Sequence, residues 1–221
     1  MPRDTKKILR ALLRQEVVSR HLTSLKEHHL ETYQHSLRVG SLCLDVGVLL
    51  DLAPNELELL GLSGLLHDIG KRRITDDILS KRTPLDAKEK EAMSRHPRLG
   101  FLELGEEGNE VVRRVIVTHH EYKLDPYPRK GQERRQDERV EGRRMSGELS
   151  DTFGQVVAVA DIYDALASRR SYKPPLSEED VEAELRRQFT GDSRYIDLVL
   201  QVQGHCRSVG TVPAGDDELP S

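Results

Sequence analysis

The sequence predicts an all-α protein, and three observations support this fold class. Charged residues make up 33% and hydrophobic residues 36% of the 221 residues, a balance that is typical of amphipathic helices. Aromatic residues account for only 4% and tryptophan is absent, which disfavours an aromatic-rich β-sandwich. Apolar residues recur at helical spacing along most of the chain, and no segment strongly predicts a strand.

The first half of the chain shows this periodicity in five segments. It predicts helices over residues 8–13, 37–46, 55–67, 86–104 and 109–121. Asn55 is placed to cap the start of the third helix, and Gly70 is placed to end it. A chain of this length leaves little room beyond one core, since a domain typically has roughly 100 to 200 residues.

The second half begins with residues 122–152, where the periodicity disappears. Between Tyr122 and Arg144 there are eight Lys or Arg residues against five Asp or Glu residues. Structureless connections this long are usually functional or disordered. We therefore predict a loop or lid that closes over an anionic ligand, and a solvated insertion remains the alternative.

Helices resume at residues 153–168, and further helices are expected from Ser177 and over residues 194–206. The spacing of Ser177 and Asp180 predicts a capping box. The expected organisation is an N-terminal helical segment packed on the core (1–30), one main domain (31–207) and a flexible tail (208–221).

Composition also limits the partners and the compartment. A net charge of −4 offers no global positive field for polymeric nucleic acid, whereas a small anionic ligand needs only a local basic patch. The apolar stretches are too short to span a membrane, and no signal peptide is visible, so we expect no membrane association. Cys43 and Cys206 are too few for a disulfide framework or a thiolate zinc site, which favours a reducing cytoplasm.

Three apolar segments end in residue types that bind metals. Leu62–Leu66 precedes His67 and Asp68, residues 111–117 precede His119 and His120, and residues 156–160 precede Asp161. An ionised carboxylate beside so much apolar sequence needs a cation or several donors to offset its desolvation. A metal ion would supply that charge.

Two more histidines extend this set. His35 lies four residues after Glu31 on one helical face, and His96 precedes Pro97. A lone histidine is more often hydrogen-bonded than metal-bound, and we keep that interpretation for the four histidines without companion motifs: His21, His28, His29 and His205. Imidazole and carboxylate ligands without thiolate suit Fe, Mn or Zn.

Several separated motifs occur in a characteristic order. They are His67-Asp68-Ile69-Gly70-Lys71, the segment from Ile78-Leu79-Ser80-Lys81 through Pro84-Leu85 to His96-Pro97 and Gly100, the triplet His119-His120-Glu121, and Ala160-Asp161-Ile162-Tyr163-Asp164-Ala165-Leu166. With them, residues 31–176 resemble the HD-GYP domains of the HD superfamily of metal-dependent phosphohydrolases. HD-GYP proteins are cyclic di-GMP phosphodiesterases of bacteria, so the resemblance implies signalling chemistry on a cyclic dinucleotide. It also implies an HD-domain helical bundle with a site for two or three metal ions.

The resemblance implies a role for particular residues. The expected metal ligands are Glu31, His35, His67, Asp68, His96, His119, His120 and Asp161. Asp68 is expected to bridge two metals and, with Lys71, to be catalytic, while Lys71, Arg170 and Lys173 are expected to hold the substrate phosphates. A solvated surface position remains the alternative for Lys71. Asp164 is open between orienting a metal ligand and making a structural hydrogen bond.

The sequence departs from the family pattern after the histidine pair. Full members read HHExxDGxGYP, whereas residues 119–128 here have one residue fewer and neither glycine. The resemblance therefore indicates hydrolysis with two or three divalent transition-metal ions, Fe or Mn first and Zn or others as alternatives. A small nucleotide or phosphodiester is the expected partner. Two alternatives stay open: a signalling module that binds a nucleotide or a protein without turnover, and a hydrolase of another phosphate ester. The sequence leaves the oligomeric state open.

Overall fold

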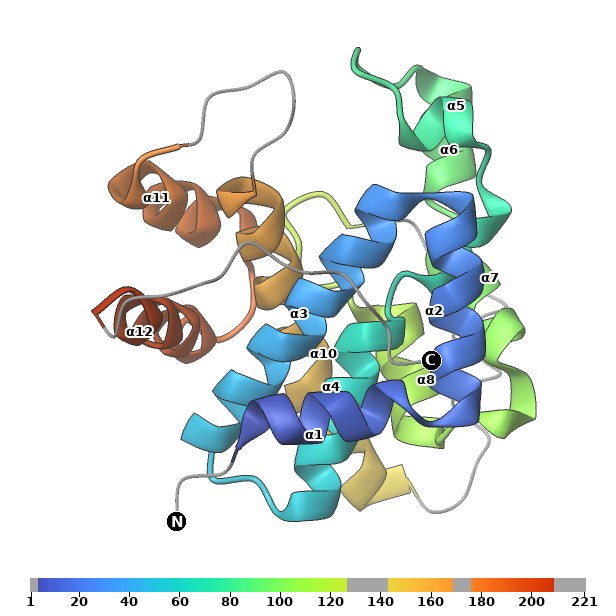
Figure 1. Ribbon diagram of the computed structural model, residues 1–221. Coiled ribbons are helices and arrows are strands. Elements are labelled where there is room, and N and C mark those ends of the chain that lie inside the picture. The colour runs from blue at the N-terminus through green and yellow to red at the C-terminus, as the bar shows by residue number, and fades with distance from the viewer. Residues whose placement is uncertain (1–3, 127–142, 169–175, 209–221) are drawn as a thin grey trace.

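The computed structural model describes residues 4–126, 143–168 and 176–208, and this part of the chain is helical with short connections (Figure 1). In order, the elements are α1 Thr5–Leu13, α2 Glu16–His28, α3 Leu30–Leu49, α4 Pro54–Leu66, the 3-10 helix η1 Ile69–Arg73, α5 Asp76–Leu79, α6 Ala87–Met93, α7 His96–Leu104, η2 Gly105–Glu107, α8 Glu110–Thr118, α10 Arg143–Ala167, α11 Glu178–Gln188 and α12 Arg194–Ser208. Among the described residues, strand-like pairing is confined to one antiparallel bridge between Lys123 and Phe189. The predicted all-α fold is confirmed.

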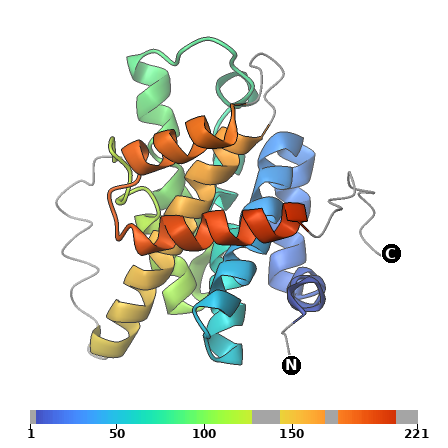
Figure 2. The same ribbon diagram turned by 90° about the vertical axis from the view of Figure 1, so that its left-hand side faces the viewer.

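The central element is α10. Phe153 and residues 156–160 of this helix have no exposed surface, because α3, α4 and α8 pack against it together with α11 and α12. Figure 2 shows α11 and α12 crossing over α10 on the face turned to the viewer. This burial places Asp161, the next residue along α10, in the interior of the bundle.

The N-terminal helices form a second part of the core. Buried residues of α1 and α2, such as Leu12, Leu22 and Leu25, pack with Leu57 and Leu65 of α4. No described helix is long and apolar enough to cross a membrane.

Helices α3 and α4 pack closely because both carry glycine at their contact. A Cβ atom added to Gly64 would lie 2.9 Å from the Cα atom of Gly40. The close approach brings the C-terminal end of α4 against α3. His67 caps that end of α4, and His35 lies on the facing part of α3.

Helix α2 lies within the helical segment expected over residues 1–30 but was not predicted as a separate helix. Its buried residues Val18, Leu22 and Leu25 have helical spacing, but nine of its 13 residues are polar and neither end carries glycine or proline. Its boundary with α3 depends instead on His29, whose Nδ1 accepts a hydrogen bond from the Thr32 amide.

Several predicted boundaries differ from the structure, among them the start of α3, which begins at Leu30 and not at Leu37. The expected helix over residues 86–104 is two helices, separated at Ser94 and Arg95, and Pro97 lies in the first turn of α7, where proline is tolerated. The helix expected over residues 55–67 is α4, shifted by one residue at each end. Ala53 and not Asn55 is its N-cap, because Pro54 takes the first helical position, where proline is favoured.

The predicted loop over residues 122–152 also needs correction. Residues 143–152 belong to α10, which begins ten residues before the expected Phe153. Glu148 and Asp151 are exposed there, so the apolar pattern that marks a buried helix is weak. Residues 127–142 of the predicted lid lie outside the described part of the chain.

Candidate metal centre

Three histidines at helix ends are held in one orientation by the backbone. His67, His96 and His119 each donate Nδ1–H to the carbonyl oxygen of the residue three positions earlier, at 2.8, 2.9 and 2.8 Å respectively. A neutral imidazole with its proton on Nδ1 has an unshared electron pair on Nε2. The backbone hydrogen bonds therefore leave three Nε2 atoms unprotonated and able to bind a metal ion.

The fourth imidazole, His35 of α3, is oriented by a carboxylate. Its Nδ1 lies 2.7 Å from Asp164 Oδ2, and Arg38 donates two hydrogen bonds to the same carboxylate, at 2.7 and 2.9 Å. Burial alone would lower the pKa of His35, but its hydrogen bonds to Asp161 and Asp164 outweigh this and raise the pKa to about 9. Its Nε2 lies 3.1 Å from Asp161 Oδ1.

Asp68 lies at the middle of these imidazoles and is only 1% exposed. Its Oδ1 lies 3.1 Å from His96 Nε2, its Oδ2 lies 3.4 Å from His67 Nε2, and Lys71 donates a 2.6 Å hydrogen bond to Oδ2. Burial by itself raises the pKa of a carboxyl group, but Lys71 and His67 outweigh it, so the pKa of Asp68 is well below its ordinary value. Both of its oxygens face nitrogen atoms of the cluster.

Asp161 is the second buried carboxylate, and α10 supplies it. Its Oδ1 faces His35, and Lys123 donates a 2.6 Å hydrogen bond to its Oδ2. Burial opposes ionisation here too, but the charge of Lys123 and the hydrogen bond from His35 keep the pKa of Asp161 well below its ordinary value.

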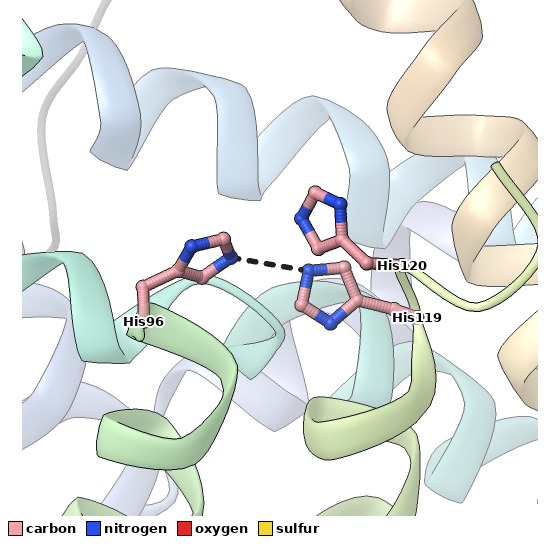
Figure 3. Close-up of side chains that lie close together, drawn as sticks. All are labelled: His96, His119 and His120. Atoms are coloured by element: carbon pink, nitrogen blue, oxygen red, sulfur yellow. Dashed lines mark hydrogen bonds between the residues drawn. The ribbon is translucent and has the colours of Figure 1, made fainter. Parts of the chain in front are cut away.

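His120 completes a group of three imidazoles with His96 and His119, and Figure 3 shows their rings turned toward one another. The ring centroid of His120 lies 5.0 Å from that of His96 and 4.3 Å from that of His119. Burial lowers the pKa of all three, and it lowers those of His119 and His120 well below the ordinary value. At neutral pH the three rings are therefore neutral and able to bind a metal ion.

The chemistry of these donors fits a divalent metal ion. Nε2 of His96 and Nε2 of His119 lie 3.3 Å apart although both rings use Nδ1–H elsewhere, so two electron pairs face each other unless a cation lies between them. Nε2 of His67 is buried and, among the described residues, has no hydrogen-bond partner. A buried polar atom of this kind is stabilised by a cation, and nitrogen with carboxylate oxygen is a set that transition-metal ions accept.

The donors form three overlapping groups, in each of which the ligand atoms lie within 4.8 Å of one another. The groups are His96, His119 and His120; His35, His67 and Asp161; and His67, Asp68 and His119. The structure thus brings together seven of the eight ligands predicted from the sequence.

The other predicted site residues are not members of these three donor groups. Glu31 is exposed in the first turn of α3 and belongs to none of the three groups. Lys71 is paired with Asp68, while Arg170 and Lys173 lie outside the described residues.

The histidines set aside as structural take no part in the three groups of donors. His28 donates from Nε2 to the carbonyl oxygen of Ile74 at 2.7 Å, and His29 caps α3. His21 is buried in the N-terminal part of the bundle. The side chain of His205 lies outside the described residues.

Two residues that contact the carboxylates of the candidate site were not predicted from the sequence. Arg38 lies one turn after His35 on α3, and Lys123 lies in the segment that departs from the HD-GYP pattern. Neither side chain is a common metal ligand, so a search for ligand types passes over both. Their role depends on Asp164 and Asp161, which are far away in sequence.

The segment that carries Lys123 is fixed by the end of α11 and by the connection that follows it. The Leu124 amide donates to the Gln188 carbonyl at 2.8 Å, and the Thr190 amide donates to the Tyr122 carbonyl at 2.9 Å. These two bonds flank Lys123 and hold its backbone beside Asp161.

Histidines and aspartates from several helices meet at one interior site, so the class of protein is an all-α bundle with a candidate metal centre. The family model of the HD domain matches residues 32–166, and the chain belongs to this family. Among curated proteins, the 3'3'-cGAMP-specific phosphodiesterase 2 of Vibrio cholerae is 31% identical over 177 residues, which cover 78% of this chain and 31% of that protein.

Two further relatives carry the name of the other cyclic dinucleotide. A cyclic di-GMP phosphodiesterase of Thermotoga maritima is 32% identical over 74% of this chain and 42% of its own length. A cyclic di-GMP phosphodiesterase response regulator of Xanthomonas campestris is 31% identical over 75% of this chain and 43% of its own length. The chain thus spans less than half the length of these relatives.

Proposed function

We propose that this protein is a metal-dependent phosphodiesterase that hydrolyses a cyclic dinucleotide of the cyclic di-GMP type. The observation that carries the proposal is the set of imidazoles whose Nδ1 atoms are engaged by backbone or Asp164, so that four Nε2 atoms surround Asp68 and Asp161. Relatives that cover most of this chain are named as phosphodiesterases of cyclic di-GMP or 3'3'-cGAMP.

The metal ions would be held by the seven clustered donors, with Asp68 as the bridging ligand. Its two oxygens face His96 on one side and His67 on the other, which suits a carboxylate shared by two ions. We propose two or three divalent ions, Fe or Mn first, and Glu31 as a ligand of the third. Bound at this site, such ions supply Lewis acidity and lower the pKa of a water molecule to near neutrality.

The protein's own cations would handle the phosphate. The oxygen of water would form a bond to phosphorus and give up a proton, the ester bond from phosphorus to the leaving oxygen would break, and the leaving oxygen would take up a proton. Lys71 lies beside Asp68 at the site, where its ammonium group would neutralise a non-reacting phosphate oxygen. Arg170 and Lys173 are proposed for the other phosphate, because a guanidinium group suits bidentate binding of phosphate oxygens.

A different phosphate ester is the second candidate for the substrate. The observation that favours it is the segment after His120, which lacks both glycines of the HD-GYP pattern and places Lys123 against Asp161. In this candidate the metal chemistry is the same and only the recognition of the bases differs. Binding of a nucleotide or a signalling protein without turnover is the third outcome that an assay has to separate.

One experiment separates these candidates. The purified chain is analysed for bound metals, reloaded with Mn²⁺ or Fe²⁺, and assayed against cyclic di-GMP, 3'3'-cGAMP and bis(p-nitrophenyl) phosphate. Release of a linear dinucleotide, lost in Asp68→Ala together with the metal, is the expected result. Hydrolysis of the nitrophenyl ester alone supports the second candidate. Binding of a dinucleotide without product supports the third, and hydrolysis by metal-free protein refutes the metal mechanism.

A further inference from the structure

The ammonium group of Lys123 is placed directly on a candidate metal ligand. It lies 2.6 Å from Asp161 Oδ2, while the other oxygen of Asp161 lies 3.1 Å from His35 Nε2. The two oxygens of one carboxylate therefore have different neighbours: one faces a positive charge, and the other faces the imidazole side of the site.

Two properties keep Lys123 in this place. Its backbone is fixed on both sides by the bonds of Tyr122 and Leu124 to Thr190 and Gln188. Its side chain is only 21% exposed, so the ion pair is shielded from water on most sides. How Asp161 binds a metal therefore depends on whether its ion pair with Lys123 is kept.

The donor groups define which oxygen is available. His35, His67 and Asp161 form one compact group, and Oδ1 is the Asp161 oxygen beside His35. A metal bound by Oδ1 leaves the contact of Oδ2 with Lys123 intact, whereas a metal chelated by both oxygens has to displace the ammonium group. The first arrangement retains a unit positive charge close to the metal.

We propose that Lys123 restricts Asp161 to one metal-binding oxygen and, through its charge, weakens the affinity of the site for divalent ions. The inference rests on the metal centre of the proposed function and not on its substrate. A lower affinity raises the concentration of free metal at which the site becomes occupied, so occupancy would follow the metal concentration around the protein. Lys123 is then a positioning residue that sets metal affinity.

Three substitutions separate charge from hydrogen bonding. Lys123→Met removes both, Lys123→Gln keeps a hydrogen-bond donor without the charge, and Lys123→Arg keeps both. Lys88 is an exposed lysine of α6 away from the site, so Lys88→Met is the matched control. Metal-free samples of each full chain are titrated with Mn²⁺ in competition with a fluorescent chelator, and thermal unfolding in EDTA checks that each variant folds.

The expected result is Mn²⁺ binding that is roughly tenfold tighter in Lys123→Met and Lys123→Gln, since removing a unit charge near a divalent ion has this order of effect even in water. Lys123→Arg and Lys88→Met should stay within about twofold of wild type. Unchanged or weaker binding in both uncharged variants overturns the inference while leaving the proposed function in place. Absence of Mn²⁺ binding in wild type and all variants overturns both.

Discussion

Gly70 lies where η1 meets α7, and its replacement by alanine is expected to disturb both stability and metal binding. A Cβ atom at this position would lie 2.0 Å from the carbonyl oxygen of His96 and 2.4 Å from the amide nitrogen of Gly100. Both are backbone atoms, which cannot rotate away as a side chain does. Helix α7 has to move, and it carries the candidate ligand His96 with it.

The size of the effect follows from this overlap. Overpacking a protein interior costs about 1 to 3 kcal/mol, and contact with backbone places Gly70→Ala near the upper end, at about 3 kcal/mol. For a protein of this size, 1 kcal/mol shifts the melting temperature by about 2 to 4 °C, so the expected fall is about 6 to 12 °C. Affinity for Mn²⁺ should fall with it because His96 is displaced.

Gly147 of α10 provides the matched control. No described atom lies within 4 Å of a Cβ atom added there, so Gly147→Ala should raise the free energy of unfolding by about 0.5 to 1 kcal/mol through higher helix propensity. Both variants are compared by thermal and urea unfolding in EDTA, followed by Mn²⁺ titration. Wild-type stability and wild-type affinity in Gly70→Ala would refute the argument from backbone overlap.

Three further predictions concern the site. Asp164→Asn should lower metal affinity by about 10- to 100-fold because His35 loses its carboxylate partner, and unchanged affinity in a chelator competition would make that contact purely structural. Adding a divalent ion at about 100 times its dissociation constant should raise the free energy of unfolding by about 2.7 kcal/mol, and EDTA should reverse this gain. A melting temperature that changes neither with the ion nor with EDTA would contradict a metal site in the folded state. Lys71→Ala should retain its metal at saturating concentration but lower kcat by about 100-fold, as expected for loss of one charge-stabilising group, and wild-type kinetics would exclude Lys71 from catalysis.

The sequence predicted which donor side chains cluster better than it predicted the residues that orient them. Five of the seven clustered donors follow apolar segments, which is a local pattern, and His35 and His96 were added from their own local motifs. Asp164 was considered for an orienting role, and its contact with His35 supports that alternative. The partner Arg38 and the ion pair of Lys123 with Asp161 depend on long-range packing, which no local pattern reports.

The helix boundaries show a similar limit. The buried positions of α2 were spaced as in a helix, but polar residues outnumber them and its ends lack glycine and proline. The break between α6 and α7 had a local signal in Pro97, which favours the first turn of a helix. The start of α10 had no such local signal, because Glu148 and Asp151 near the start of the helix are exposed to solvent.

The pairing between Tyr122 and Thr190 has a consequence for what counts as the minimal functional unit. The family match ends at residue 166, so a fragment cut there would keep all seven clustered donors. It would lose Thr190 and with it the support of the segment that carries Lys123. If Lys123 acts as proposed, sequence change at the end of α11 or in its connection to α12 would alter metal affinity while all seven clustered donors stay the same.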